Sequence, residues 1–336
     1  MPPTASSSPS ASAPERPNPS QNASRILIAF GCVYFFWGST FVAIRFGVAV
    51  LPALVLSSAR YLIAGPLMLA LCALGGLRLR QSWRNLGILA LIGVLMLGLG
   101  NTGLVWSEQF LSSGFASLLI ASIPLFVAIL ETVLPNGERL RTRGWLGIAV
   151  GFTGLLILVI PGLRESRHGH SGQLIGATVA IASAFVWSCA SVLARRSRLP
   201  VSPFVAAGWE MTFGGLFNVL LTLAFGGRSG GFGAAHFSMQ AALSVAYLVV
   251  FGSLVGYSSY VYLLDNVPVA KVSTYAYINP IVAVILGAIF LRERMVAIEY
   301  AGMTAILIAV YLVTSSKLQS GAPAAIEECV AAEPPA

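Results

Sequence analysis

Long runs of apolar residues, separated by short polar segments, follow one another along almost the whole chain. None of these runs has the polar face that marks a helix at the surface of a soluble protein. About 20 apolar residues cross a bilayer core as a helix, so the pattern predicts transmembrane helices. Ten such runs can be drawn, near 26–47, 52–75, 86–107, 113–134, 144–162, 172–194, 203–226, 241–264, 270–291 and 297–315.

The second half of the chain repeats features of the first. The matched pairs are Trp37 with Trp187 and Arg45 with Arg195, 150 positions apart (187 − 37), and Gly100 with Gly256, Ser117 with Ser273 and Pro124 with Pro280, 156 apart (280 − 124). The predicted repeats are residues 25–162 and 172–315, each with five helices. Because five is odd, the second repeat would cross the bilayer upside down. Inverted repeats are typical of transporters that work by alternating access.

The expected fold is therefore an all-α polytopic membrane protein with ten transmembrane helices in two inverted five-helix repeats. Hydrophobic residues make up 57% of the chain and charged residues only 10%, which excludes an ordinary soluble domain. Residues 1–24 and 316–336 are rich in small residues and proline, and their composition predicts disordered tails.

The Lys and Arg residues predict the orientation of the bundle. With the N-terminus inside, thirteen of them fall in cytoplasmic segments and six on the opposite side. This asymmetry predicts that both termini lie in the cytoplasm. The expected location is a bacterial inner (plasma) membrane. The basic net charge thus reflects topology, and no basic stripe with interleaved aromatics indicates nucleic-acid binding.

The sequence lacks the residue patterns of an enzyme or a cofactor site. His168, His170 and His236 fall in short loops, without the further ligands that a metal site needs. No Ser/His or paired Asp arrangement lies within a span, and no phosphate-binding glycine loop occurs. We therefore predict no catalytic activity, no cofactor and no metal. The four cysteines indicate no disulfide framework.

Three ionisable residues lie inside the apolar runs: Arg60, Glu131 and Glu210. Each costs at least about 2.5 kcal/mol at a helix centre, so each should face protein or water. Arg60 and Glu210 are repeat mates (210 − 60 = 150) of opposite sign, and both should lie near the bilayer midplane. Two interpretations stay open, a transport site or a buried salt bridge that fixes packing. Glu131 lies near a helix end, where it can extend toward Arg139 or Arg143.

Polar and aromatic residues recur in the middle of the spans. Singly they are explained by contacts between helices, but as a set they predict an aromatic, hydrogen-bonding pocket for a small organic solute. The candidate substrate-binding residues are Trp37, Ser39, Thr40, Arg60, Asn101, Trp106, Trp187, Glu210, Tyr257, Tyr260, Tyr277 and Asn279. Pro124 and Pro280 each free a carbonyl four residues earlier, and the matched pair predicts kinks that serve gating.

Motifs in both halves resemble one family. They are WGSTFVAIRFG at 37–47, GNTGLVWSEQFLSSG at 100–114, GWEMTFGG at 208–215 and STYAYINPIVAVILG at 273–287, with GER at 137–139 and RER at 292–294. In this order they resemble the EamA-type drug/metabolite transporter superfamily, most closely its drug/metabolite exporter branch. The resemblance covers residues 26–315.

The resemblance implies ten helices, cytoplasmic termini and a central cavity formed by spans one to four and six to nine, with spans five and ten peripheral. Members move amino acids, other metabolites or toxic compounds, usually outward, and some exchange them for protons. The small four-helix relatives use a Glu in the first span, where this chain has none. Proton coupling would then fall to Glu210, the one deep carboxylate.

The predicted function is a secondary active transporter that exports small metabolites, amino acids or drug-like compounds by alternating access. Its expected partners are the solute and the lipid bilayer, with protons as the candidate coupling ion. Two alternatives stay open: an uncoupled or uptake permease for the same solutes, and a membrane protein that does not transport. The sequence specifies neither the solute nor the direction, because an inverted repeat favours neither face.

Overall fold

The computed structural model describes residues 19–135, 140, 142–166, 172–229, 233 and 238–318. The helices of the first half are α1 (Pro19–Cys32), η1 (Val33–Trp37), α2 (Gly38–Val48), α3 (Ala53–Leu74), α4 (Trp83–Gly93), η2 (Val94–Asn101), α5 (Thr102–Ser107), α6 (Ser113–Ile120), α7 (Ile123–Val133) and α8 (Thr142–Ser166). Those of the second half are α9 (Gly172–Ser197), α10 (Pro203–Ser229), α11 (Met239–Tyr247), η4 (Leu248–Tyr257), α12 (Ser258–Asn266), α13 (Val269–Val272), α14 (Tyr275–Leu286), η5 (Gly287–Leu291) and α15 (Ala297–Leu318). The η segments are π-helical.

Consecutive helices join into long apolar rods. In the described residues, eight are long and apolar enough to cross a membrane: Ala23–Val48, Ala53–Leu74, Trp83–Ser107, Ser113–Val133, Thr142–Ile160, Gly172–Ser197, Pro203–Gly226 and Met239–Asn266. Two further apolar helices, Tyr275–Leu291 and Ala297–Val313, are shorter. The prediction of an all-helical, multi-pass membrane fold is confirmed. Ten crossings and the inversion of the second repeat stay predictions.

The chain ends differ in part from the boundaries expected from composition. α1 begins at Pro19 and so includes the last part of the 1–24 segment. Proline suits the first position of a helix because the amide it lacks has no partner there. The rest of the predicted tails, residues 1–18 and 319–336, lies outside the described residues, as do the three histidines and Cys329.

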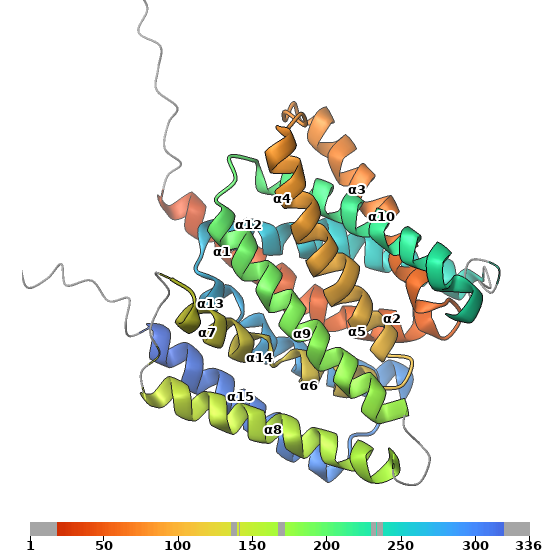
Figure 1. Cartoon of the computed structure of the whole chain (residues 1–336), viewed down its shortest axis with the longest axis vertical. Helices are drawn as coiled ribbons and strands as arrows, with labels where there is room; N and C mark the ends of the chain where they lie inside the picture. The colour runs from red at the N-terminus through yellow and green to blue at the C-terminus, as the bar shows by residue number, and fades with distance from the viewer. Residues whose placement is uncertain are drawn as a thin grey trace, which may run out of the picture.

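α8 and α15 pack along each other at the lower edge of the bundle in Figure 1. Their contact is made by small residues: a Cβ added to Gly147 would lie 2.8 Å from the carbonyl oxygen of Ala309, and one on Gly151 would lie 3.1 Å from the Cβ of Ala309. Small residues allow helices in lipid to approach closely and gain van der Waals contact. This placement agrees with the expectation that spans five and ten are peripheral.

α3 and α10 also pack along each other, at the opposite edge of the bundle (Figure 1). A Cβ on Gly65 of α3 would lie 2.5 Å from the backbone nitrogen of Thr212, and one on Gly215 of α10 would lie 2.9 Å from that of Leu62. These two helices carry Arg60 and Glu210 and are the second spans of the two repeats. Equivalent helices of the two repeats therefore contact each other along their length.

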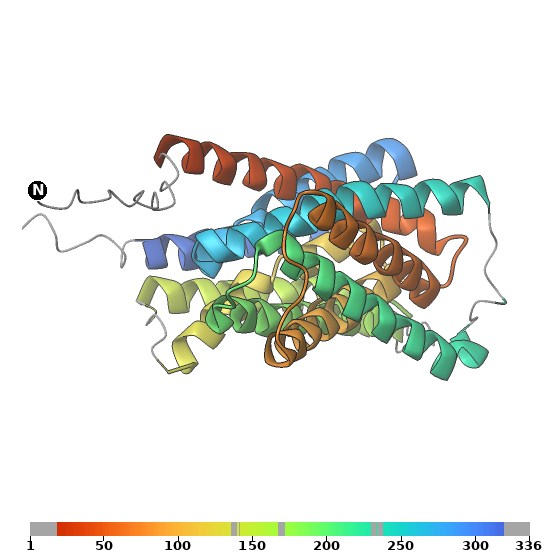
Figure 2. The same ribbon diagram turned by 90° about the horizontal axis from the view of Figure 1, so that it is seen from above.

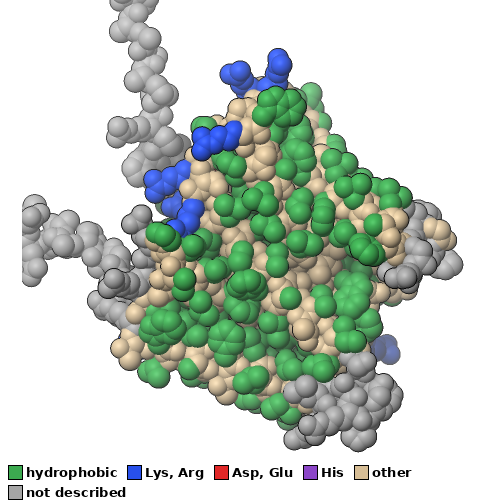
Figure 3. All heavy atoms as spheres, in the orientation of Figure 1, with side chains coloured by type: hydrophobic (Ala, Val, Ile, Leu, Met, Phe, Trp, Pro, Cys, Tyr) green, Lys and Arg blue, Asp and Glu red, His purple; other side chains and the backbone are tan. Residues whose placement is uncertain are grey.

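The start of α1 and the end of α15 lie on the same side of the bundle, as two perpendicular views show (Figures 1 and 2). Lys and Arg side chains gather along one edge of the face in Figure 3, next to the α3–α4 end, while hydrophobic side chains cover its middle. An apolar surface with basic tips suits a protein that faces lipid and ends in water.

Candidate functional site

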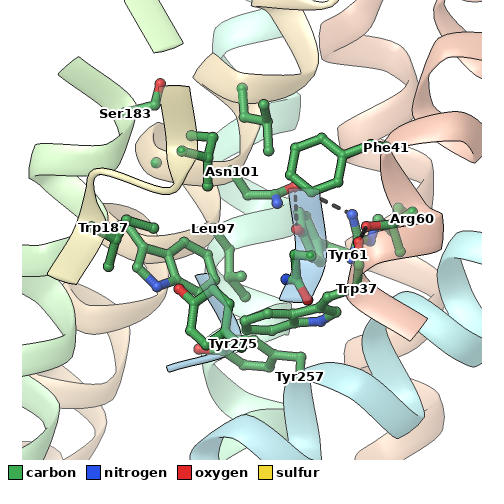
Figure 4. A pocket seen from close by; sticks show the side chains of 16 residues that line it. Trp37, Phe41, Arg60, Tyr61, Leu97, Asn101, Ser183, Trp187, Tyr257 and Tyr275 are labelled. Carbon is green, nitrogen blue, oxygen red and sulfur yellow. Dashed lines mark hydrogen bonds between the residues drawn. The ribbon is translucent and has the colours of Figure 1, made fainter. Parts of the chain in front are cut away.

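A cavity of about 530 Å³, a volume that includes space open to solvent, lies in the middle of the bundle (Figure 4). It is lined by Trp37, Thr40, Phe41, Arg60, Tyr61, Leu97, Gly100, Asn101, Leu104, Ile120, Ile123, Ser183, Trp187, Tyr257, Tyr275 and Asn279. These residues come from spans one to four, six, eight and nine. Span seven, α10, supplies no lining residue, which corrects the expectation that all eight inner spans form the wall.

Aromatic rings form one wall of the cavity. The repeat mates Trp37 and Trp187 meet edge to face, with ring centroids 5.5 Å apart, and Trp37 also contacts Tyr260 at 4.9 Å and Tyr275 at 5.2 Å. The Trp37 indole donates a hydrogen bond to the Gly252 carbonyl, 3.0 Å away. Edge-to-face contacts hold rings in fixed orientations, so this wall is preformed for an apolar or aromatic group.

Arg60 provides the positive charge of the cavity. Its side chain is 3% exposed, its Nε donates to Ser253 Oγ at 2.8 Å and its Nη1 to Asn101 Oδ1 at 3.3 Å. Tyr61 Oη donates to the same Asn101 oxygen at 2.6 Å. Among the described residues, the ion pair that forms joins Glu131 to Arg196. Arg60 takes part in no ion pair there. Arg60 is thus held by neutral oxygens and retains its positive charge at the cavity.

The two asparagines satisfy the expectation that buried amides find partners. Asn101 accepts the two hydrogen bonds just described. The Asn279 side chain faces the carbonyl oxygens of Tyr34 and Tyr275 at 2.9 and 3.3 Å, so its amide nitrogen occupies that position and donates to both. Thr40 Oγ1 donates to the Trp37 carbonyl at 2.6 Å. The polar groups of the wall are therefore anchored in place.

Asn101 and Tyr257 are repeat mates (257 − 101 = 156), and each is the last residue of a π-helical segment, η2 or η4. A π-helix widens the turn and re-aims the side chains that follow, and such segments are frequent at functional sites. Gly100 and Gly256 precede them. A Cβ on Gly256 would lie 2.6 Å from the Trp37 ring, so glycine is required for that contact.

Glu210 lies outside the central cavity. Its buried carboxylate accepts a hydrogen bond from Tyr257 Oη at 2.7 Å, and it lines a second cavity of about 430 Å³ together with Asp265. The hypothesis that Arg60 and Glu210 share one pocket or form a salt bridge is therefore wrong for this structure. Tyr257 lines the first cavity and contacts the carboxylate of the second, so this residue separates the two.

Four more of the sequence candidates lie away from the central cavity. Tyr260 stands behind the tryptophans, where its hydroxyl accepts from Trp187 Nε1 at 3.2 Å. Ser39 is hydrogen-bonded to the Tyr247 hydroxyl at 2.6 Å. The Trp106 ring contacts that of Phe110 at a tilt of 54°, and Tyr277 packs at the margin of the core. None of these four residues lines the central cavity, so their location does not support the predicted contact with the solute.

Seven candidates line the cavity: Trp37, Thr40, Arg60, Asn101, Trp187, Tyr257 and Asn279. The other lining residues were not among the candidates predicted from the sequence. Most of these are apolar or small and differ in no way from the residues of any span. Tyr61 and Tyr275 are aromatic residues in the middle of spans, and Tyr61 is adjacent to Arg60. Their mid-span position is the signal by which the sequence could have indicated them.

The fourth span (α6 and α7) and the ninth span (α13 and α14) differ in where they bend. α6 ends at Ile120 and α7 begins at Ile123, so Pro124 is the second residue of a helix and not in its middle. Pro280 lies inside α14, and the break in that span comes earlier, between Val272 and Tyr275. The expectation of matching mid-helix prolines is thus corrected, while their role in gating stays a prediction.

The model of the EamA-like transporter family matches this sequence twice, at residues 24–160 and 174–315. The inner membrane transporter YedA of Escherichia coli K12 is 35% identical over 297 residues, which cover 87% of this chain and 92% of YedA. The transporter YvbV of Bacillus subtilis is 27% identical, over 90% of this chain and 95% of its own length.

Similar proteins also occur outside bacteria. A WAT1-related chloroplastic protein of Arabidopsis thaliana is 28% identical over 83% of this chain and 67% of its own length. One crystal structure of a protein 20% identical has the same fold, with a TM-score of 0.64 over 89% of this chain and 99% of that chain.

Proposed function

Because the chain belongs to the EamA-like transporter family, and is therefore a membrane transporter, we propose that it exports a small metabolite by secondary active transport and alternating access. The observation that carries this proposal is Arg60, a buried cation at a cavity with no carboxylate partner among the described residues. Keeping such a charge out of water costs several kcal/mol. The cost is understandable if a solute completes the pair.

The lining groups favour a solute with two parts. An acidic group would accept charge-assisted hydrogen bonds from the Arg60 guanidinium. An apolar or aromatic part would pack on Trp37 and Trp187, whose rings are held edge to face. Amino acids and small organic acids with a hydrophobic side chain combine these two features. We propose this solute class within the broader range of metabolites and drug-like compounds that the family suggests.

The proposed orientation is two inverted five-helix repeats with both termini in the cytoplasm of a bacterial inner membrane. Three observations support it: the double match of one family model, the position of both described chain ends on one side, and the excess of basic residues predicted for that side. The similar protein YedA is named as an inner membrane transporter, which agrees with this location.

Proton coupling is proposed for Glu210, which can exchange a proton with the second cavity while its partner Tyr257 contacts the first. Uncoupled transport and uptake use the same site and are alternatives for direction and energy source. Flux of a pool of amino acids and organic acids into proteoliposomes, with and without a pH gradient, separates them. A gradient that leaves flux unchanged would favour the uncoupled permease.

The test of the site is substitution of Arg60. Arg60→Gln should weaken the apparent affinity for acidic solutes roughly 10- to 100-fold, the worth of a hydrogen bond to a charged group. Arg60→Lys should retain part of it, because the charge remains while the two-point contact is lost. Because Arg60 has no ion-pair partner, its removal strands no buried counter-ion, so protein yield should not fall.

Arg84→Gln is the matched control, since Arg84 is exposed at the start of α4. It should transport as the wild type does. Undiminished flux of acidic solutes through Arg60→Gln would remove the basis of the proposal.

A further inference from the structure

A third buried ionisable group lies at the end of the third span, away from both cavities. Glu108 follows α5, and its side chain is 0% exposed. Neither of its carboxyl oxygens has a hydrogen-bond partner. A carboxylate without donors is among the costliest groups to bury, because it loses its hydration and gains nothing in return. Glu108 therefore suits its surroundings as a neutral acid.

The charged neighbours of Glu108 come from two other segments. Arg45 of α2 donates from Nη1 to the main-chain carbonyl of Glu108 and not to its carboxylate. Burial raises the pKa of the Glu108 carboxyl well above its ordinary range, the Arg45 guanidinium lowers it, and the Glu293 carboxylate raises it further. The described parts of α3, α6 and α9, which also pack against α5, add no third charge.

Glu293 differs from Glu108 in every contact. It accepts from the backbone nitrogen of Ser113 with both oxygens at 3.1 Å, and from Ser113 Oγ at 2.6 Å. It thereby caps the start of α6, where a negative charge is stabilised by the helix dipole. Gly287 leaves the space for it, since a Cβ there would lie 2.8 Å from Glu293 Oε2. Of these two acids, Glu293 has hydrogen-bond donors for its carboxyl oxygens and Glu108 has none.

We propose that Glu108 is a proton-binding site that is occupied while this end of the bundle is closed and empty when the end opens. The proposal rests on the transporter function proposed above. Opening must separate the three segments that carry Arg45, Glu108 and Glu293, because their contacts hold the closed end together. Water then reaches Glu108, its carboxyl O–H bond breaks, the proton passes to that water, and Arg45 gains a carboxylate within reach.

The direction of the pH effect follows from this difference in hydration. The closed end binds one more proton than the open end over the pH range between the ordinary and the raised pKa of Glu108. Acid therefore favours the closed end and alkali the open end, by up to about tenfold per pH unit. This site is distinct from Glu210, which lines the second cavity beside Tyr257.

Protonation is measured first, on the full-length protein in lipid nanodiscs. Infrared difference spectra recorded across a pH titration should show the carbonyl stretch of a protonated carboxyl persisting well above the pH at which an exposed Glu ionises. Glu108→Gln should lack this band. Glu108→Met, which fills the same space without a polar group, should lack it as well and provides a second variant if the first is poorly folded. Glu299→Gln is the control at the same end of the bundle and should keep the band.

Opening is measured next, by access of a charged thiol reagent from outside right-side-out vesicles. Leu104 lines the central cavity one helical turn before Glu108, so Leu104→Cys reports opening of this end. The background replaces all four native cysteines with serine. Labelling should rise with pH in this reporter and in its Glu299→Gln form. With Glu108→Gln or Glu108→Met added, labelling should stay low at every pH, because the neutral side chain imitates the protonated acid.

Each outcome decides the proposal. A Glu108 band that disappears at ordinary carboxyl pH overturns the proton site, and so does unchanged pH dependence of labelling in both Glu108 variants. If both measurements behave as expected while no solute moves in proteoliposomes, the transport proposal fails and the proton site stands.

Discussion

At the scale of single residues, Glu210 of the second cavity accepts a hydrogen bond from Tyr257, which lines the first. If Glu210 carries the coupling proton, Glu210→Gln should abolish accumulation driven by a pH gradient, because glutamine cannot release a proton in the working range. Exchange between equal pools of solute should continue, since it requires the cavity but no net proton movement. Both are measured as flux in proteoliposomes with and without the gradient.

The control for this prediction is protein yield. A structural ion pair with Arg60 would make Glu210→Gln destabilising by about 3–5 kcal/mol, because it would strand a buried charge. The two residues do not pair, so yield and melting temperature should be close to those of the wild type. Gradient-driven accumulation by Glu210→Gln would exclude the carrier role.

Arg60 and Glu210 also mark the limit of what the sequence predicts about a site. Counting residues along each span predicts that both lie deep in the bundle, and both are buried. It does not predict in which direction each side chain points, because that depends on the rotation of the helix about its axis. Gly93 lets α4 contact the backbone of Glu210 directly, and this contact helps fix the rotation. Arg60 and Glu210 were both candidates for one substrate pocket, but Arg60 lines the first cavity and Glu210 the second.

At the scale of elements, the break in the fourth span and the break in the ninth are out of register by one turn. Ser122 and Thr274 make equivalent bonds to the residue three before them, and they are 152 positions apart (274 − 122), four fewer than the repeat offset of 156. Accordingly α6 has eight residues and α13 has four. The two repeats thus adopt different conformations of the same span.

This difference predicts an exchange of roles between the two prolines. Pro124 is at the start of α7, where the missing N–H costs nothing, while Pro280 is inside α14, where it costs up to about 3 kcal/mol. If the ninth-span break moved on by four residues, Pro280 would occupy the start of a helix. Pro280→Ala should therefore favour the present state by up to roughly a hundredfold. Labelling of Leu104→Cys from outside should fall and the melting temperature should rise.

Pro66→Ala provides the comparison, because Pro66 lies inside α3, which has no break. It should raise the melting temperature without changing labelling. Equal effects of the two substitutions would show that Pro280 contributes to stability alone.

The register difference could not be predicted from the sequence, because Pro124 and Pro280 have equivalent positions in it. The two equivalent prolines have different positions in their helices, and tertiary contacts decide which conformation each span adopts. The π-helical ends of η2 and η4 are a second such case. The residues before Asn101 and Tyr257 are apolar apart from two glycines in each segment and one serine, and this composition does not distinguish a π-helical from an α-helical segment.

At the scale of the whole molecule, the helical stretches were predictable because hydrophobic length is a property of composition. Eight of the ten predicted runs form helices long enough to span a membrane. The run near 270–291 forms a shorter helix because its first residues separate as α13. In the run near 297–315, the apolar helix counted as Ala297–Val313 is the shorter one. Contact between the repeats, as between α3 and α10, depends on single glycines and was not predicted.

The inverted topology predicts where labels attach. In a background without the other cysteines, Cys329 should react only with reagents that enter the cytoplasm, and a cysteine at His236 should react from outside. The reason is that an odd number of spans lies between them if the first repeat and the second are inverted. The measurement is labelling of intact cells with permeant and impermeant thiol reagents. Reaction of both positions from the same side would exclude the inverted repeat.

The unpaired Arg60 also couples the carrier to the electrical potential across the membrane. The described wall of the empty cavity has one positive charge, and the wall with a monovalent anion bound has none. Moving one charge through the whole field is worth about 2.3 kcal/mol per 100 mV. A potential that is negative inside would therefore draw the empty cavity back to the cytoplasm, while the loaded cavity crosses without electrical work. The voltage alone would then drive an anionic solute outward.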